Sequence, residues 1–267
     1  MLNFEVIRAL ILDMDGVIWK DQQPLGDLPA IFNRIKQLGW KIIFASNNST
    51  YAVEHFLEKI HRFGIKLEPW QMVGSAEVTA IYLQKQYPKG GAVFVVGEKG
   101  LAQTLEKYGF YPSETGVLAV VAGLDRTITY DKLARATLLI RAGIPFIGTN
   151  PDLTYPTTDG QVPGAGAVLA LLDAASGIHP LILGKPGTAI YHICLERLGT
   201  KPGETLVVGD RIETDIAGGQ AAGCPTALVL SGVATIEQAR KWQPPPDWIG
   251  QDLETLVLNG ARTARKL

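Results

Sequence analysis

Short apolar segments alternate with amphipathic helical stretches along almost the whole chain. Residues 9–12 form the first apolar run, which is too short for a buried helix and is followed by a polar loop. Residues 28–38 then have the spacing of a helix with one buried side, and Gly39 provides a helix stop. The same alternation predicts further strands at 41–45, 92–96, 117–122, 145–147, 181–183, 205–208 and 226–230, and helices that begin at 49 or span 101–108, 130–141, 165–175, 188–198 and 214–222.

Strands that alternate with helices of this length predict an α/β protein with parallel sheets covered by helices on both faces. Because crossovers between parallel strands are right-handed, the strand-to-helix loops of a sheet lie at one edge. Ligands of such folds bind beyond the carboxyl ends of the strands. The loops after Leu12, Ala45, Leu183 and Val208 are therefore the first places to look for a site.

The composition is that of a globular protein without a charge bias. The chain has 267 residues, of which 46% are hydrophobic and 19% charged, so it can bury a sizeable core. Its 25 Lys and Arg nearly balance its 26 Asp and Glu, so global charge gives no support to a nucleic-acid or membrane partner. Two cysteines make no disulfide framework, and the chain shows neither a signal-peptide pattern nor an apolar run that could span a bilayer. We therefore expect a cytoplasmic protein.

Acidic residues follow two of the predicted buried strands. Asp13 and Asp15 come directly after the first strand, and Asp210 comes after the strand at 205–208, with Asp215 one helical turn further on. Alone, the first pair could be an ordinary Asp-Gly turn with Gly16. Asp215 could equally be an acid that the first turn of a helix favours.

Two other loops offer groups that suit an anion. Ser46, Asn47 and Asn48 supply a hydroxyl and amides before a predicted helix, and Lys185 precedes another helix. Taken singly, the first loop reads as a plain helix cap and Lys185 as a surface lysine. Together, the four loops predict one site: Asp13 and Asp210 supply hard oxygen ligands for Mg²⁺, Ser46 and Lys185 suit phosphate oxygens, and one carboxylate remains to attack phosphorus.

In these four loops, the sequence resembles a known family. Its motifs are similar to the four motifs of haloacid-dehalogenase-superfamily phosphatases, and more narrowly to the NagD-like, para-nitrophenyl-phosphatase branch. The similarity covers essentially the whole chain. It rests on Asp13-Met14-Asp15-Gly16-Val17, Ser46-Asn47-Asn48, Gly184-Lys185-Pro186 and Gly209-Asp210-Arg211-x-x-Thr214-Asp215, and it extends to Gly97-Glu98-Lys99-Gly100-Leu101, Gly123-Leu124-Asp125, Thr149-Asn150-Pro151-Asp152 and Pro163-Gly164-Ala165-Gly166.

The resemblance implies a Rossmann-like parallel-sheet core with an inserted α/β cap domain. We place the core in residues 1–78 and 180–267 and the cap in 79–179. Asp152, Thr154 and Tyr155, in the segment 150–160, are the cap residues that would choose the substrate, although a plain surface hairpin would give the same pattern. A homodimer formed through the cap is a further expectation from the family.

The resemblance also assigns roles. Asp13 would be the nucleophile that forms an aspartyl-phosphate, and Asp15 would protonate the leaving alcohol and then activate water. Mg²⁺ would be held by the Asp13 carboxylate, the Asp15 backbone carbonyl and the Asp210 carboxylate. The phosphate would be bound by Ser46, Asn47, Asn48 and Lys185. Asp215 would not bind the metal directly but would steady Lys185 or a metal-bound water.

These observations predict a magnesium-dependent phosphatase that acts on small phosphate monoesters, such as a sugar phosphate, a nucleotide, pyridoxal phosphate or phosphoglycolate. Asp15 favours phosphatase over dehalogenase chemistry, because release of an alcohol benefits from an acid. Two alternatives stay open: a phosphoryl-transferring mutase of the same superfamily, and a regulatory protein that binds phosphate esters and has lost catalysis. Intact Asp13, Asp15, Lys185 and Asp210 argue against the second.

Other parts of the sequence partly resemble a dinucleotide-binding loop, a zinc site or a ligand-stacking site, but they do not support any of these. Gly164-Ala165-Gly166 lacks the third glycine of a dinucleotide loop, because position 169 is Leu169, so we interpret it as a turn into a helix. Histidine and cysteine spacings do not support a zinc site. Trp19 and Trp40 are interpreted as packing residues rather than as ligand-stacking rings.

Overall fold

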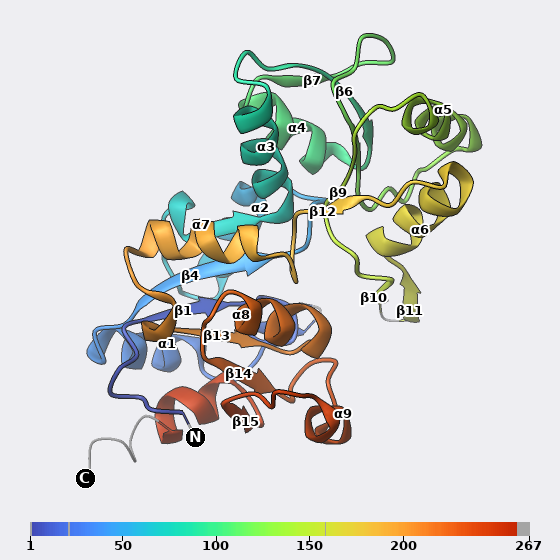
Figure 1. The fold of residues 1–267 in the computed structure, drawn as a ribbon. Coiled ribbons are helices and arrows are strands. Elements are labelled where there is room, and N and C mark those ends of the chain that lie inside the picture. The colour runs from blue at the N-terminus through green and yellow to red at the C-terminus, as the bar shows by residue number, and fades with distance from the viewer. Residues whose placement is uncertain (1, 21, 158, 261–267) are drawn as a thin grey trace. The chain divides into compact units, whose positions relative to one another are not determined.

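The computed structural model describes residues 2–20, 22–157 and 159–260 (Figure 1). The chain divides into two compact units, each of which is considered by itself. The first comprises Met1–Ala45, Phe56–Val73 and Tyr191–Leu267, and the second comprises Ser46–His55 and Gly74–Ile190.

The first unit is built on a six-stranded sheet in the order β15-β14-β13-β1-β4-β5. The pairs from β15 to β4 are all parallel. Counted along the chain, this is the 3-2-1-4-5-6 order of a Rossmann-like sheet, which confirms the predicted fold class. The strands are β1 (Ala9–Leu12), β4 (Lys41–Ser46), β5 (Met72–Gly74), β13 (Thr205–Gly209), β14 (Thr226–Val229) and β15 (Trp248–Gly250), and a small ribbon joins β2 (Trp19–Lys20) to β3 (Gln23–Pro24).

The two central strands, β1 and β13, define the important edge of this sheet. Every residue of both strands is buried, and Leu12 lies opposite Val208 in the parallel register. After β1 the chain continues to β4 on one side, whereas after β13 it continues to β14 on the other. The strand order therefore reverses between β1 and β13, which is where ligands bind in open α/β sheets.

Helices of the first unit follow local sequence signals. In α1, the Asp27 side chain accepts a hydrogen bond from the Ala30 N–H at 3.0 Å, and Leu28, Ile31 and Ile35 are buried. The helical elements are α1 (Leu28–Gln37), α2 (Val53–Arg62), α7 (Thr188–Leu198), the π-helical turn η3 (Ile212–Ile216), α8 (Ala217–Ala221), α9 (Ile236–Lys241), the π-helical segment η4 (Thr255–Gly260), and the 3₁₀ turns η1 (Pro69–Gln71) and η2 (Pro202–Glu204).

One predicted helix start is wrong. We expected a helix from Ser49, but α2 begins at Val53. The Asn48 side-chain oxygen accepts hydrogen bonds from the Thr50 N–H at 3.0 Å and the Thr50 hydroxyl at 2.7 Å. This local side-chain turn takes the place of the first helical turn.

The second unit has its own five-stranded sheet, in the order β12-β9-β8-β6-β7 with parallel pairs throughout. In Figure 1, α3 and α4 lie on one side of this sheet, and α5 and α6 lie on the other. An apolar core joins the sheet to α5 and α6, through Phe94 and Val120 on the strands and Ile140 and Leu172 on the helices. The elements are α3 (Ser75–Gln86), β6 (Gly91–Val96), α4 (Lys99–Lys107), β7 (Phe110–Pro112), β8 (Val120–Ala122), α5 (Tyr130–Arg141), β9 (Phe146–Gly148), β10 (Thr154–Thr157), β11 (Gly160–Pro163), α6 (Ala165–Ser176) and β12 (Leu181–Ile182).

The observed units differ from the domain boundaries placed at 79 and 180. β12 pairs with β9, so the second unit continues past 180 and ends at Ile190. It also takes in Ser46–His55 and all of α3. Sequence patterning missed α3 because its buried positions are mostly small or polar, such as Ser75, Ala76 and Thr79.

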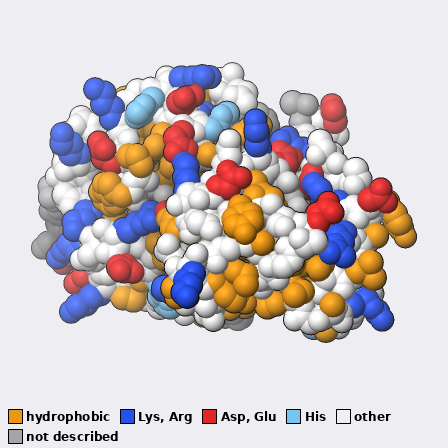
Figure 2. Space-filling model, turned by 90° about the horizontal axis from the view of Figure 1, so that it is seen from above, with side chains coloured by type: hydrophobic (Ala, Val, Ile, Leu, Met, Phe, Trp, Pro, Cys, Tyr) orange, Lys and Arg blue, Asp and Glu red, His pale blue; other side chains and the backbone are white. Residues whose placement is uncertain are grey.

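On the face drawn in Figure 2, acidic and basic side chains are interspersed rather than gathered by sign, in keeping with the formal net charge of −1. No helix in the part of the chain that the structure describes is both long and apolar enough to cross a membrane.

Candidate active site

Three acidic side chains meet at the edge where the order of the first sheet reverses. One carboxylate oxygen from each of Asp13, Asp210 and Asp215 lies within 4.8 Å of the others. Asp13 directly follows β1, where its N–H donates to the Val208 carbonyl at 2.9 Å, and Asp210 directly follows β13. The predicted acids at the two strand ends are therefore brought together.

Asp210 is held in a buried position. Only 3% of it is exposed, its Oδ2 accepts a hydrogen bond from the Val233 N–H at 2.8 Å, and its carbonyl accepts one from the Ala234 N–H at 3.0 Å. Burial, together with the nearby charges of Asp13 and Asp215, raises the pKa of Asp210 well above its usual range. A negative charge is thus costly here unless a cation offsets it.

Glycines line this acidic cluster because no side chain would fit beside it. A Cβ at Gly16 or Gly232 would overlap the Asp210 carboxylate, and a Cβ at Gly209 would overlap Asp215. Gly16 also has φ +78°, a left-handed conformation that suits glycine. The Asp215 carboxylate is also fixed by a backbone contact, because its Oδ2 accepts a hydrogen bond from the Arg211 N–H at 3.1 Å.

This donor set fits a divalent cation. Three carboxylates are hard oxygen ligands of the kind that Mg²⁺ and Ca²⁺ prefer, and two of them, on Asp210 and Asp215, are at most 3% exposed. The grouping differs in one detail from the ligand set implied by the family resemblance. It includes the carboxylate of Asp215, whereas the resemblance implies that Asp215 does not bind the metal directly.

The side chain of Asp15 lies outside this group of three. It is exposed, and its Oδ1 accepts a hydrogen bond from the Trp19 indole Nε1–H at 2.7 Å. Asp13 and Asp15 therefore have different surroundings although one residue separates them, which is compatible with different roles.

In the second unit, the Asn47 side chain connects two of the predicted phosphate-binding loops. Its Oδ1 accepts from the Lys185 N–H at 2.8 Å, and its Nδ2 donates to the Lys185 carbonyl at 3.0 Å and to Asp152 Oδ2 at 3.1 Å. The Asn47 carbonyl in turn accepts from the Asn150 Nδ2 at 2.7 Å and the Ser75 hydroxyl at 2.8 Å. The side chain of Asn47, whose backbone is predicted to bind phosphate, thus holds the Lys185 backbone in place.

The remaining predicted residues are placed as follows. Lys185 is only 3% exposed, so it is not the surface lysine that we considered as an alternative. Ser46 Oγ accepts from the Asn48 N–H at 3.1 Å. Asp152 contacts Asn47, whereas Thr154 and Tyr155 lie on β10 of a two-stranded hairpin with β11.

The glycines at 164 and 166 have a packing role. A Cβ at either position would overlap the carbonyl of Asp152 or Pro151, and the Gly166 N–H donates to the Asp152 carbonyl at 2.8 Å. Gly164 precedes α6, as expected for a turn into a helix. The two glycines therefore allow α6 to approach the 150–152 segment.

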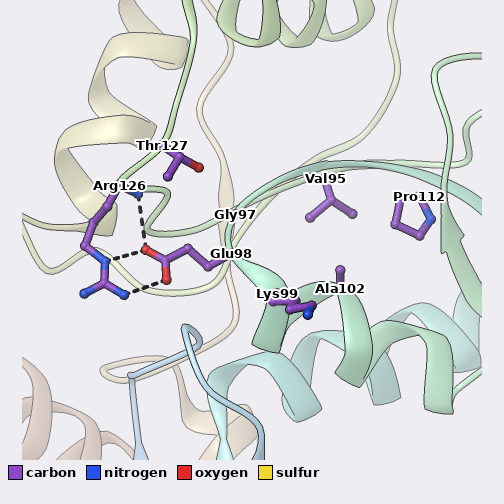
Figure 3. Close-up of a pocket in the computed structure, with 8 residues that line it drawn as sticks. All are labelled: Val95, Gly97, Glu98, Lys99, Ala102, Pro112, Arg126 and Thr127. Carbon is purple, nitrogen blue, oxygen red and sulfur yellow. Dashed lines mark hydrogen bonds and ion pairs between the residues drawn. The ribbon is translucent and has the colours of Figure 1, made fainter.

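An open pocket of about 560 Å³ lies in the second unit (Figure 3). Its acid, Glu98, forms a bidentate ion pair with Arg126, with N–O distances of 2.6 and 2.7 Å. The described residues that line it include no histidine, cysteine or serine, and its one acid is occupied by the Arg126 ion pair. They are Val95, Gly97, Glu98, Lys99, Ala102, Pro112, Arg126 and Thr127.

Sequence reasoning missed several residues that shape the site. The loop after β14 contributes the Val233 N–H to Asp210 and the Ser231 hydroxyl to the Gly16 carbonyl, at 2.8 and 2.6 Å. A signal was available, because this loop also follows a buried parallel strand of the same sheet. The roles of Ser75 and Asn150 as supports for Asn47 had no comparable signal.

Gly232 provides a test of the tight packing around Asp210. We expect Gly232→Ala to raise the Mg²⁺ concentration for half-maximal activity by about 10–100-fold, because the new methyl group displaces the Asp210 carboxylate. Gly203→Ala is the matched control, since a Cβ at Gly203 meets nothing within 4 Å. Thermal unfolding of both variants separates this effect from misfolding, and an unchanged Mg²⁺ requirement in folded Gly232→Ala would contradict the packing argument.

The sequence matches two family models. One is described as haloacid dehalogenase-like hydrolase and covers residues 10–111, and the other is described as HAD-hydrolase-like and covers residues 182–256. Among curated proteins, the chain is 34% identical over 251 residues to the acid sugar phosphatase of Staphylococcus aureus, covering 94% of this chain and 96% of the relative.

Solved structures agree over nearly the full length. A p-nitrophenyl phosphatase from Archaeoglobus fulgidus matches with a TM-score of 0.89 and 33% identity, over 94% of this chain and 98% of that one. NagD from E. coli K-12 matches with a TM-score of 0.85 and 29% identity, over 92% of this chain and 97% of that one. A glycerol phosphate phosphatase from Mycobacterium tuberculosis, solved in complex with magnesium, matches with a TM-score of 0.87 and 33% identity, over 96% of this chain and 78% of that one. The same phosphatase was also solved in complex with calcium. This chain therefore belongs to the haloacid dehalogenase-like hydrolases, and within them it is a phosphatase similar to NagD and the p-nitrophenyl phosphatases.

Proposed function

We propose that this phosphatase hydrolyses small-molecule phosphate monoesters with Mg²⁺ and through an aspartyl-phosphate on Asp13. The observation that carries the proposal is the meeting of Asp13, Asp210 and Asp215 within 4.8 Å at the edge where the strand order of the first sheet reverses. Three acids placed so closely, two of them buried, suit a bound cation better than any purely structural role.

Asp13 and Asp15 divide the chemistry. The Asp13 carboxylate attacks phosphorus, a P–O bond forms to Asp13, and the bond to the leaving alcohol breaks as Asp15 donates it a proton. Asp15 then accepts a proton from a water molecule that attacks the aspartyl-phosphate, which releases inorganic phosphate and restores both carboxyl groups.

The proposed phosphate-binding groups are the Ser46 hydroxyl, the Asn47 backbone N–H, Asn48 and the Lys185 ammonium. Phosphoryl transfer spreads negative charge over three equatorial oxygens, so fixed donors and a fixed cation stabilise the transition state. The paired hydrogen bonds between the Asn47 amide and the Lys185 peptide support this assignment, because they fix the backbone that carries the ammonium.

Mg²⁺ would be held by the Asp13 and Asp210 carboxylates, with the Asp15 backbone carbonyl as a further ligand and Asp215 close by. When bound, it would reduce the repulsion between the Asp13 carboxylate and an anionic phosphate. The acidic cluster supports this choice by its hard oxygen donors, and burial together with the neighbouring Asp13 and Asp215 raises the pKa of Asp210.

The substrates that we propose first are sugar phosphates and glycerol phosphate, since similar proteins carry these names. Asp152, Thr154 and Tyr155 remain the proposed specificity residues. A panel of phosphorylated metabolites ranked by kcat/KM tests the substrate class. The homodimer expected through the cap also stays a prediction, which light scattering of the purified chain tests.

Removal of metal is the direct test of the proposed chemistry. We expect the chelator-treated enzyme to release no p-nitrophenol from p-nitrophenyl phosphate above background, and Mg²⁺ to restore the rate, because the buried acids then regain their counter-charge. Circular dichroism before and after chelation shows whether the fold persists. Full turnover by the metal-free enzyme would contradict the proposal.

A further inference from the structure

We propose that Trp19 is a positioning residue for Asp15, an inference that rests on the proposed function of Asp15 as the proton donor. The Trp19 indole Nε1–H donates to Asp15 Oδ1 at 2.7 Å. The sequence alone indicated only a packing role for this tryptophan. The contact gives it a second role at the chemical step.

A tight turn brings the two residues together. The Met14 carbonyl accepts from the Ile18 N–H at 2.8 Å, and the Gly16 N–H donates to the Trp19 carbonyl at 2.7 Å. With Gly16 in its left-handed conformation, the chain makes a turn and Trp19 returns beside Asp15 through an isolated parallel bridge. Residues that follow the nucleophile thus build the support for the acid.

The indole ring is itself fixed by its surroundings. Trp19 is 1% exposed, the Lys59 Nζ lies 4.1 Å from the centre of its ring, and the Phe63 ring packs at 6.2 Å with an interplanar angle of 44°. A cation over the face of an indole is attracted to the ring. The donor that contacts Asp15 is therefore held in one place before substrate binds.

The direction of this hydrogen bond has a chemical consequence. An indole N–H can only donate, so Asp15 Oδ1 must act as the acceptor. The proton that Asp15 passes to the leaving alcohol is then carried on Oδ2. Rotation of the Asp15 carboxyl group about its Cβ–Cγ bond has only weak intrinsic preferences, and the hydrogen bond from Trp19 restricts it.

The test is the dependence of kcat/KM on the leaving group in Trp19→Phe. This substitution removes the N–H and keeps an aromatic ring against Lys59 and Phe63. The parameter kcat/KM reports steps up to release of the alcohol, and p-nitrophenol leaves with little need for a proton, whereas alkyl alcohols need one. We expect kcat/KM for glycerol phosphate to fall by about tenfold or more relative to kcat/KM for p-nitrophenyl phosphate.

Trp40→Phe is the matched control, because Trp40 is also buried in the first unit and stacks on Phe4. We expect it to leave the ratio between the two substrates unchanged. An equal loss for both substrates in Trp19→Phe, or no loss, would overturn the inference, since packing damage does not distinguish leaving groups.

Two further variants complete the design. We expect Asp15→Asn to lower kcat/KM for glycerol phosphate, relative to kcat/KM for p-nitrophenyl phosphate, by more than Trp19→Phe does. If Asp15→Asn leaves this ratio unchanged, Asp15 is not the proton donor, and this conclusion does not depend on the result for Trp19. If Trp19→Phe does not fold, Lys59→Met loosens the indole without removing it. A fall of less than about tenfold in kcat/KM for glycerol phosphate, relative to kcat/KM for p-nitrophenyl phosphate, would then support the proposal. An unchanged ratio of the two values would overturn it.

Discussion

Replacing Asp13 by Asn is expected to lower kcat for p-nitrophenyl phosphate by about 10⁴-fold or more. The substitution keeps the size of the side chain and removes the nucleophilic oxygen charge. It also weakens the acidic cluster that Asp13 forms with Asp210 and Asp215. Release of p-nitrophenol at saturating substrate and Mg²⁺ measures the effect.

Glu213→Gln is the matched control for this variant. Glu213 is exposed and lies in η3 together with Asp215, three residues after Asp210, so the change removes one negative charge nearby without touching the cluster. We expect near-normal turnover. If purified Asp13→Asn stayed within tenfold of the unaltered enzyme, Asp13 could not be the nucleophile.

Lys185→Met is expected to lower kcat/KM by about 10²–10³-fold, the usual cost of losing one fixed donor to a developing negative charge. Lys185 is almost fully buried, and Asn47 fixes its peptide from both the N–H and the carbonyl. The ammonium is therefore placed with little freedom. Competitive inhibition by inorganic phosphate should weaken alongside kcat/KM, which steady-state kinetics with added phosphate measures.

Lys99→Met is the control that tests whether loss of any lysine in the second unit lowers kcat/KM as much as loss of Lys185. Lys99 is exposed and lines the open pocket at the start of α4. We expect its replacement to change kcat/KM less than twofold, about the size of ordinary surface effects. Similar small effects of both lysine variants would remove Lys185 from the phosphate site.

The parts of the site that the sequence predicted are those with a strong local pattern. Asp13 and Asp210 follow fully buried strands, and a charged residue in that position is conspicuous without any knowledge of the fold. That they meet depends on β13 pairing directly with β1, although nearly 200 residues separate the two strands along the chain. The alternation of strands and helices predicted a parallel sheet, and the motif resemblance implied that this sheet is a Rossmann-like core.

Other features depend on side-chain contacts that no periodic pattern encodes. The Asn47 amide holds the Lys185 peptide across a sequence separation of 138 residues. Gly232 is needed only because the Asp210 carboxylate passes beside it. Helix α3 escaped prediction for a related reason, since its small and polar residues are buried against neighbours rather than arranged as an apolar stripe.

The chemical identity of the phosphorylated residue tests the central claim most directly. Enzyme mixed with substrate and Mg²⁺ is quenched during turnover, reduced with borohydride, digested and examined by mass spectrometry. An acyl phosphate on Asp13 is reduced to homoserine, so we predict homoserine at position 13 and its absence when substrate is omitted. Homoserine at position 15 instead, or a stable phosphate on a serine, threonine or histidine, would contradict it.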